Sequence, residues 1–146
     1  MNEKTPATTI LAFDYGLSQI GLAVGNTQLN TSQPLTTIKA KDGIPKWDEV
    51  AALLEEWQPD QLLVGLPLNM DGSESDMCQR ARKFAARLEG RFGAKVKMVD
   101  ERLTSFAAKE ILRDQGHAGN YKRQPADAMA AKLILETWLQ SGPAPR

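Results

Sequence analysis

Three carboxylates occupy positions where predicted elements of secondary structure end or begin. Asp14 and Glu101 each follow a short apolar run typical of a buried strand, and Asp127 lies in the first turn of a predicted helix. If all three lie together, each pair repels by about 4 kcal/mol at ~4 Å and an effective dielectric near 20, so a cation is expected between them. Oxygen ligands suit Mg²⁺ or Mn²⁺, and two such ions are typical of sites that hydrolyse phosphodiester bonds.

Each carboxylate also has an ordinary structural interpretation. Asp14 precedes Gly16 and could form a turn, and Glu101 could be an exposed charge at the end of a strand. Asp127 could be favoured in a first helical turn by the helix dipole alone. The argument for a shared site therefore depends on whether the fold brings the three positions together.

The apolar pattern predicts five strands and four helices. The predicted strands cover residues 10–13, 20–25, 34–38, 62–64 and 96–99, and the predicted helices cover about 47–57, 75–92, 104–115 and 125–139. Pro59 should end the first helix and Gly93 the second. Ser73, with Asp76 three residues later, resembles a capping box at the start of the second helix.

This order predicts a mixed α/β sheet. Three meandering strands are followed by two that are reached through right-handed helical crossovers, which gives the sheet order 3-2-1-4-5 with helices on both faces. That order is the ribonuclease-H-like arrangement. Strands one, four and five are parallel in it, so their carboxyl ends, with Asp14 and Glu101, meet at one edge of the sheet, where open α/β folds bind ligands.

Length and composition indicate one globular domain. The chain has 146 residues and 16.1 kDa, with 42% apolar and 25% charged residues. We expect a single domain over residues 1–146, with its core at about 8–140 and short flexible tails at both ends. The one cysteine, Cys78, excludes an internal disulfide or a cysteine-based zinc site, and no apolar run is long enough to span a membrane. We therefore expect a cytoplasmic protein.

Charge is distributed unevenly along the chain. The formal net charge is zero, which excludes a uniformly basic coat for nucleic acid. Residues 1–73, however, carry 4 Lys/Arg against 9 Asp/Glu, a net charge of −5, and residues 74–146 carry 14 against 9, a net charge of +5. A basic half of this kind can contact a polyanion such as nucleic acid, although both charge sets could also be simply solvated.

Several polar and cationic side chains are candidates for that contact. On the second predicted helix, four cations fall within an arc of about 80° beside the apolar stripe. We call these four cations the ridge: Arg80, Lys83, Arg87 and Arg91. The other candidates are Arg102, Lys122, Arg123 and Asn69. The alternatives are a solvated helix face for the ridge, local pairing with Asp100 or Asp114 for the other cations, and a turn at Asp71-Gly72 for the segment that carries Asn69.

Four motifs in a fixed order resemble a known family. They are FDYG at 13–16 with IGLAVG at 20–25, VGLPLNMDG at 64–72, DERLTS at 100–105 and DAMAA at 127–131. Together they resemble the YqgF family of Holliday junction resolvase-like proteins, which are also described as nucleases that mature the precursor of small-subunit ribosomal RNA. The resemblance implies a ribonuclease-H-like fold, divalent-metal nuclease activity, and metal binding by Asp14, Glu101 and Asp127.

The leading hypothesis is therefore a Mg²⁺- or Mn²⁺-dependent hydrolase, an endo- or exonuclease that processes the ends of pre-16S rRNA. The alternatives are a Holliday junction resolvase acting on branched DNA, and a non-catalytic RNA-binding module for ribosome assembly. A nucleotide-binding phosphotransferase would need a second lobe that 146 residues do not accommodate. Structured RNA and branched DNA are both read largely through phosphate geometry, so the sequence leaves the substrate open, as it does the choice between monomer and homodimer.

Overall fold

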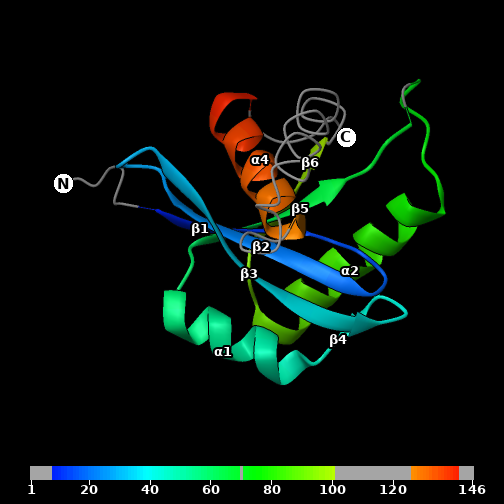
Figure 1. Cartoon of the computed structure of the whole chain (residues 1–146), viewed down its shortest axis with the longest axis horizontal. Helices are drawn as coiled ribbons and strands as arrows, with labels where there is room; N and C mark the ends of the chain where they lie inside the picture. The colour runs from blue at the N-terminus through cyan, green and yellow to red at the C-terminus, as the bar shows by residue number, and fades with distance from the viewer. Residues whose placement is uncertain (1–7, 70, 101–125, 142–146) are drawn as a thin grey trace.

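The computed structural model (Figure 1) describes residues 8–69, 71–100 and 126–141. The strands are β1 (Thr9–Asp14), β2 (Gln19–Asn26), β3 (Thr31–Lys41), β4 (Ile44–Pro45), β5 (Gln61–Leu66) and β6 (Val96–Asp100). The helices are α1 (Trp47–Trp57), α2 (Asp76–Phe92) and α4 (Ala126–Ser141). The helix predicted at about 104–115 and the two predicted tails lie mostly or wholly outside the described residues.

The sheet has the predicted topology with one strand added at its edge. Its order is β4-β3-β2-β1-β5-β6, in which β1 pairs parallel with β5, and β5 pairs parallel with β6. Leaving out the two-residue β4, this is the predicted order 3-2-1-4-5, so the α/β class with helices on both faces is confirmed. The prediction of five strands was wrong, because the described sheet has six strands and the short hairpin strand β4 was not predicted.

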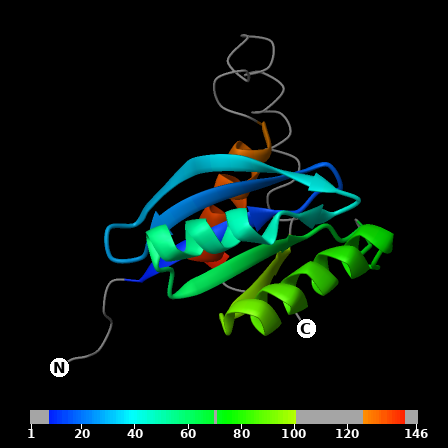
Figure 2. The same ribbon diagram turned by 90° about the horizontal axis from the view of Figure 1, so that it is seen from below.

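The helices cover the two faces of the sheet, which makes a three-layered molecule. Figure 2 shows α1 and α2 in front of the sheet and α4 behind it. On the α2 side, Phe13, Leu22 and Val64 pack with Phe84 and Leu88. On the α4 side, small and aliphatic residues form a second core: Ile10, Ala12, Ala23, Leu63, Val99, Ala131, Ile134 and Leu135. Successive residues of β1 thus alternate between the two cores, as strand geometry requires.

The ends of the helices follow local signals, with one exception. α1 ends at Gln58, whose backbone is left-handed with φ 46°, directly before Pro59, and α2 ends at Gly93 with φ 63°. The predicted capping box at Ser73 was wrong, because the N-cap residue of α2 is Ser75 and no side chain caps the helix. The hydroxyl of Ser73 instead donates a hydrogen bond of 2.6 Å to Asp71 Oδ1.

Small residues of β2 allow α4 to lie close to the sheet. A Cβ atom added at Gly25 would come within 2.6 Å of both Leu135 Cδ2 and the carbonyl oxygen of Thr31. Gly25 therefore has to lack a side chain for α4 to pack where it does. No helix in the described part of the chain is long and apolar enough to cross a membrane.

Candidate functional site

Asp14 is the last residue of β1 and is partly buried. By strand alternation it shares the α4 face with Ile10 and Ala12, which pack against that helix. Its neighbours on that face carry no side chain: Gly21 is its partner on β2, and Gly65 lies next to it on β5 by continuation of the parallel register. Asp14 is therefore a carboxylate beside two buried glycines on the α4 face, and it has an interaction partner in the structure.

Asp127 is the second residue of α4, at the end of the helix nearer Asp14. Leu135 packs over Gly25, which pairs with Ile10 at the start of β1. From Leu135 back to Asp127 the helix advances roughly 12 Å, and from Ile10 to Asp14 the strand advances roughly 13 Å. In both views the orange N-terminal end of α4 lies toward the carboxyl ends of β1 and β5 (Figures 1 and 2). The fold thus brings the first turn of α4 toward Asp14.

The third predicted carboxylate, Glu101, follows the end of β6 and lies outside the described residues, as do Arg102, Lys122 and Arg123. The side chain of Asp127 is also not described. Within the described ranges no group of three or more potential metal ligands is present. The structure therefore describes one of the three side chains, Asp14, and the backbone position of a second.

Asp100 is an acidic residue at this edge that the sequence analysis did not treat as part of the site. It is the last residue of β6, is 3% exposed, and pairs in register with Leu66. Its neighbour Val99 belongs to the core on the α4 side, so alternation turns Asp100 toward the α2 side. Asp100 has an interaction partner, as a buried carboxylate must. The motif Asp100-Glu101 thus begins with a structural acid facing away from Asp14.

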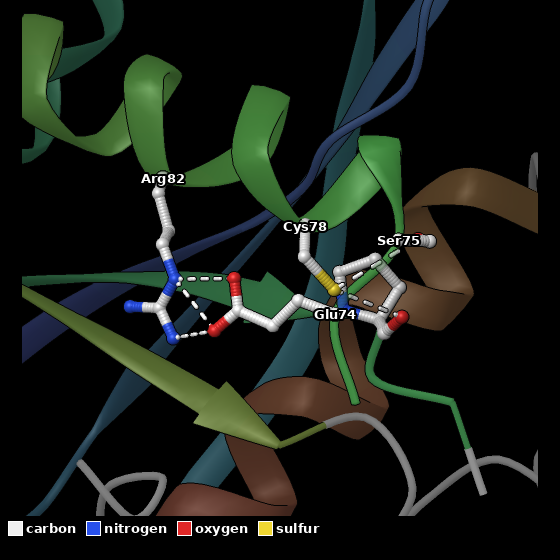
Figure 3. A network of polar contacts seen from close by, with 5 residues as sticks. Glu74, Ser75, Cys78 and Arg82 are labelled. Atoms are coloured by element: carbon white, nitrogen blue, oxygen red, sulfur yellow. Dashed lines mark hydrogen bonds and ion pairs between the residues drawn. The ribbon is translucent and has the colours of Figure 1, made fainter. Parts of the chain in front are cut away.

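The segment between β5 and α2 is anchored to the helix by polar contacts (Figure 3). The buried thiol of Cys78 donates to the carbonyl oxygen of Pro67 at 3.2 Å. The guanidinium of Arg82 faces the carboxylate of Glu74, with Nε 3.1 Å from each carboxylate oxygen. This hydrogen bond lowers the pKa of Glu74 below its ordinary value of 4.5. Both ends of the segment are therefore held against the first two turns of α2.

Asn69 belongs to a turn inside this segment. Its side-chain nitrogen Nδ2 donates to Ser73 Oγ at 3.0 Å. The backbone amide of Ser73 donates to Asp71 Oδ1 at 2.9 Å. The turn at Asp71-Gly72 that the sequence analysis gave as the alternative is therefore present, with the backbone amide of Gly72 donating to the carbonyl oxygen of Asn69 at 2.8 Å. Its proposed contact with nucleic acid stays a prediction.

The ridge separates into residues with different partners. The guanidinium of Arg91 lies 4.4 Å from the centre of the Trp47 ring, and Arg80 Nη1 lies 3.3 Å from Asp42 Oδ1. Lys83 and Arg87 are exposed and form no ion pair with any described residue. The two middle cations of the ridge are thus the ones left available for an anionic ligand.

A hairpin that the sequence analysis missed adds a wall opposite these cations. Asp42 and Gly43, with φ 51° and 81°, form the two-residue turn between β3 and β4. An Asp-Gly pair between extended segments is a recognised hairpin signal, and it could have predicted this turn. Tyr15 and Ile44, which the sequence analysis also did not single out, line a cavity of about 420 Å³ between the hairpin and α2.

Comparison with known proteins identifies relatives over nearly the whole chain. Residues 8–141 match a protein family described as "RuvX: Holliday junction resolvase". A protein of Saccharophagus degradans is 55% identical over 92% of this chain and 95% of its own length. A protein of Chromohalobacter salexigens is 59% identical over 88% and 87%, and one of Pseudomonas aeruginosa is 50% identical over 98% and 99%. All three carry the name "Putative pre-16S rRNA nuclease".

Solved structures with the same fold are resolvases of much lower sequence identity. Thermus thermophilus RuvC in complex with a Holliday junction substrate matches with a TM-score of 0.57 and 17% identity, over 94% of this chain and 99% of that one. Fowlpox virus resolvase in complex with junction DNA matches with a TM-score of 0.56 and 14% identity, over 91% and 97%. At these identities the likeness concerns the fold alone, which is that of the RuvC-like resolvases.

Proposed function

The chain belongs to the RuvX family, also called YqgF, and from that membership we propose that it is a metal-dependent nuclease. The family and its relatives carry nuclease and resolvase names, so the reaction class is hydrolysis of nucleic acid. The proposed substrate is precursor 16S rRNA, and the proposed place of action is the cytoplasm. The observation that supports this substrate is 50–59% sequence identity, over 88–98% of the chain, to relatives named "Putative pre-16S rRNA nuclease".

We propose that Asp14, Glu101 and Asp127 hold the divalent metal. The chemistry of the side chain favours a cation beside Asp14, because a carboxylate supplies the hard oxygen ligand that Mg²⁺ or Mn²⁺ prefers. Glu101 follows the last residue of β6 directly in the sequence, and Asp127 is the second residue of α4. A pair of such ions would supply positive charge beside the phosphate and a more acidic water.

The chain's own residues have separate proposed tasks in this reaction. Asp14 is the last residue of β1, which pairs with a strand on each side, so the backbone that carries its carboxylate is fixed before substrate arrives. The cations Arg102, Lys122 and Arg123 are proposed to contact phosphates next to the cleaved bond. Lys83 and Arg87 contact phosphates farther along the strand. Positioning of the cleaved phosphate is thus separated from binding of its flanking segments.

A second candidate function is resolution of branched DNA, because the matched family is described as a Holliday junction resolvase. Cleavage at two symmetric strands requires a two-fold dimer, whereas trimming of an RNA end can be performed by a monomer. Sedimentation with and without a four-way junction therefore distinguishes the two candidates: a dimer on the junction favours the resolvase, and a monomer with or without it favours the RNA nuclease.

The test of the proposed function is cleavage of matched substrates. A precursor 16S rRNA fragment and a four-way DNA junction are incubated with the protein in Mg²⁺, Mn²⁺, Ca²⁺ or EDTA. The proposal predicts cleavage of the precursor RNA in Mg²⁺ or Mn²⁺ and none in EDTA. Cleavage of the junction alone would favour the resolvase. RNA binding without cleavage under any of these conditions would contradict the nuclease and favour the non-catalytic binding module.

A further inference from the structure

A cavity of about 420 Å³ lies on the α2 side of the sheet, opposite the face that carries Asp14. We call it the α2–hairpin groove. Tyr15 and Phe84 form its floor, and Ile44 of the hairpin lines one wall. The other wall carries three cations of the ridge, Arg80, Lys83 and Arg87. Its volume falls in the range of roughly 300–1,000 Å³ for sites that bind organic groups, so it has room for more than a single ion.

The hairpin that forms one wall is fixed in place by several contacts. The backbone amide of Gly43 donates to the carbonyl oxygen of Leu17 at 2.8 Å, and that of Ala40 donates to the carbonyl oxygen of Ser18 at 2.8 Å. The phenol oxygen of Tyr15 lies so close to Gly43 that an added Cβ would be 1.9 Å away from it. The groove is therefore a preformed concavity, which favours binding because little ordering is needed.

The charge of the groove favours an anionic ligand. Asp42 partly neutralises Arg80 in an exposed ion pair, and Asp76 adds a further negative charge near the start of α2. Lys83 and Arg87 have no ion pair among the described residues and lie four positions apart, one turn of helix along the same wall. From Arg80 to Arg87 the wall advances roughly 10 Å, so a strand lying along it would have more than one phosphate within reach.

The groove begins next to the proposed catalytic carboxylate. Tyr15 follows Asp14 directly and packs against Phe84 with ring centres 5.1 Å apart, on the opposite side of the sheet from the α4 core. A polynucleotide that places one phosphate beside Asp14 can therefore pass over the end of β1 and enter the groove.

We propose that the α2–hairpin groove binds a single-stranded segment of the substrate that continues from the cleaved phosphate. This proposal rests on the proposed nuclease function, because it defines the segment by the bond that is cut. A single strand fits better than a duplex: its unpaired bases can bury their faces on Tyr15 and Ile44 while Lys83 and Arg87 contact its phosphates. A duplex would present phosphates alone and leave the apolar floor uncovered.

The test measures binding of a short fluorescent oligonucleotide by anisotropy in EDTA, so no cleavage takes place. The probes are a single-stranded oligo(U) and an oligo(dT) of the same length, and a blunt-ended RNA duplex with a similar number of phosphates. Each is titrated at several salt concentrations with wild type, Lys83→Ala, Arg87→Ala and the double variant. Lys95→Ala is the matched control, since Lys95 is an exposed lysine at the amino end of β6, away from the groove.

We expect the two cations to contribute to the salt dependence of single-strand binding. The double variant should reduce the slope of log K against log salt by about 1.4, that is about 0.7 for each phosphate that the protein no longer neutralises, while Lys95→Ala leaves it unchanged. Asp42→Asn should tighten binding, because asparagine keeps the left-handed turn but removes the opposing charge. Oligo(U) and oligo(dT) report whether the groove also distinguishes the ribose 2′-hydroxyl.

The proposal is overturned if the double variant binds oligo(U) with the affinity and salt slope of Lys95→Ala. It is also overturned if binding of the blunt-ended duplex depends on Lys83 and Arg87 as strongly as binding of the single strand does. Failure of the nuclease function has a different signature: wild type cleaves no substrate, yet the binding difference between the double variant and Lys95→Ala remains. In that case the groove is a single-strand binding site of a non-catalytic protein.

Discussion

Replacing Gly43 with alanine should destabilise the protein through two separable effects. Gly43 has φ 81°, where a side chain costs about 1–2 kcal/mol. The new Cβ would also lie 1.9 Å from the phenol oxygen of Tyr15, and overpacking of this kind typically costs about 1–3 kcal/mol. The free energy of unfolding should therefore fall by about 2–5 kcal/mol, measured by urea denaturation followed by tryptophan fluorescence.

A second substitution separates the two effects. Tyr15→Phe removes the phenol oxygen, and the next nearest atom to the added Cβ is Tyr15 Cζ at 3.0 Å. In the Tyr15→Phe background the added Cβ still meets the ring at 3.0 Å, so Gly43→Ala should cost less than in wild type but more than the backbone term alone. The coupling energy should be positive and at most about 1–3 kcal/mol. Gly90→Ala is the control, because Gly90 lies within α2 with nothing near its added Cβ and should gain about 0.5–1 kcal/mol. A cost of Gly43→Ala below about 0.5 kcal/mol, or one equal in both backgrounds, would refute the contact.

Two further predictions concern the elements around the candidate site. Leu135→Ala should lower the free energy of unfolding by about 2–5 kcal/mol in urea denaturation, because Leu135 is fully buried over Gly25; a loss below about 1 kcal/mol would contradict the packing of α4. The hydrogen bond from Arg82 lowers the folded-state pKa of Glu74 below 4.5, so its stabilising contribution is present above pH 4.5 and lost as pH falls through the lowered pKa. The difference in stability between wild type and Glu74→Gln should therefore be constant at neutral pH and shrink below about pH 4.5; a difference independent of pH would contradict the pairing.

The order of elements could be predicted because each boundary is encoded locally. Short apolar runs marked β1, β5 and β6, and helical spacing marked α1 and α2. Pro59 and Gly93 stop their helices by backbone geometry that is independent of the rest of the fold. In β2, branched residues alternate with very small ones, and Gly25 allows the close approach of Leu135 on one face.

The groove could not be predicted from periodicity, because it depends on contacts between distant segments. The β4 strand has two residues, too few for a pattern, and its place beside α2 is set by Tyr15, Leu17 and the Asp42–Arg80 pair. Helical spacing alone gave no difference between the four cations of the ridge. Their partners differ because Trp47 lies near one end of the ridge and Asp42 near the other, which only the tertiary structure determines.

The position of Asp14 at the candidate catalytic edge could be predicted from the sequence, whereas the contacts of the acidic side chains there could not. Parallel strands share their carboxyl edge, so the location of Asp14 follows from the topology, and α4 brings the backbone of Asp127 toward it. Sequence alone did not identify Asp100 as a buried acid on the α2 side of the sheet. Its orientation follows from Val99, whose place in the core on the α4 side fixes the alternation of β6.

The measurement that tests the proposed catalytic edge most directly is single-turnover cleavage by Asp14→Asn. Precursor 16S rRNA is cut in Mg²⁺ with enzyme in excess, and its binding is measured separately in Ca²⁺. Loss of a group that merely hydrogen-bonds to a metal ligand costs roughly 10–100-fold in activity. Because Asp14 is proposed as a ligand itself, its replacement should lower the cleavage rate by more than that, while the affinity for the RNA stays nearly unchanged. Cleavage at the wild-type rate by Asp14→Asn would contradict the assignment of the carboxylate edge as the catalytic site.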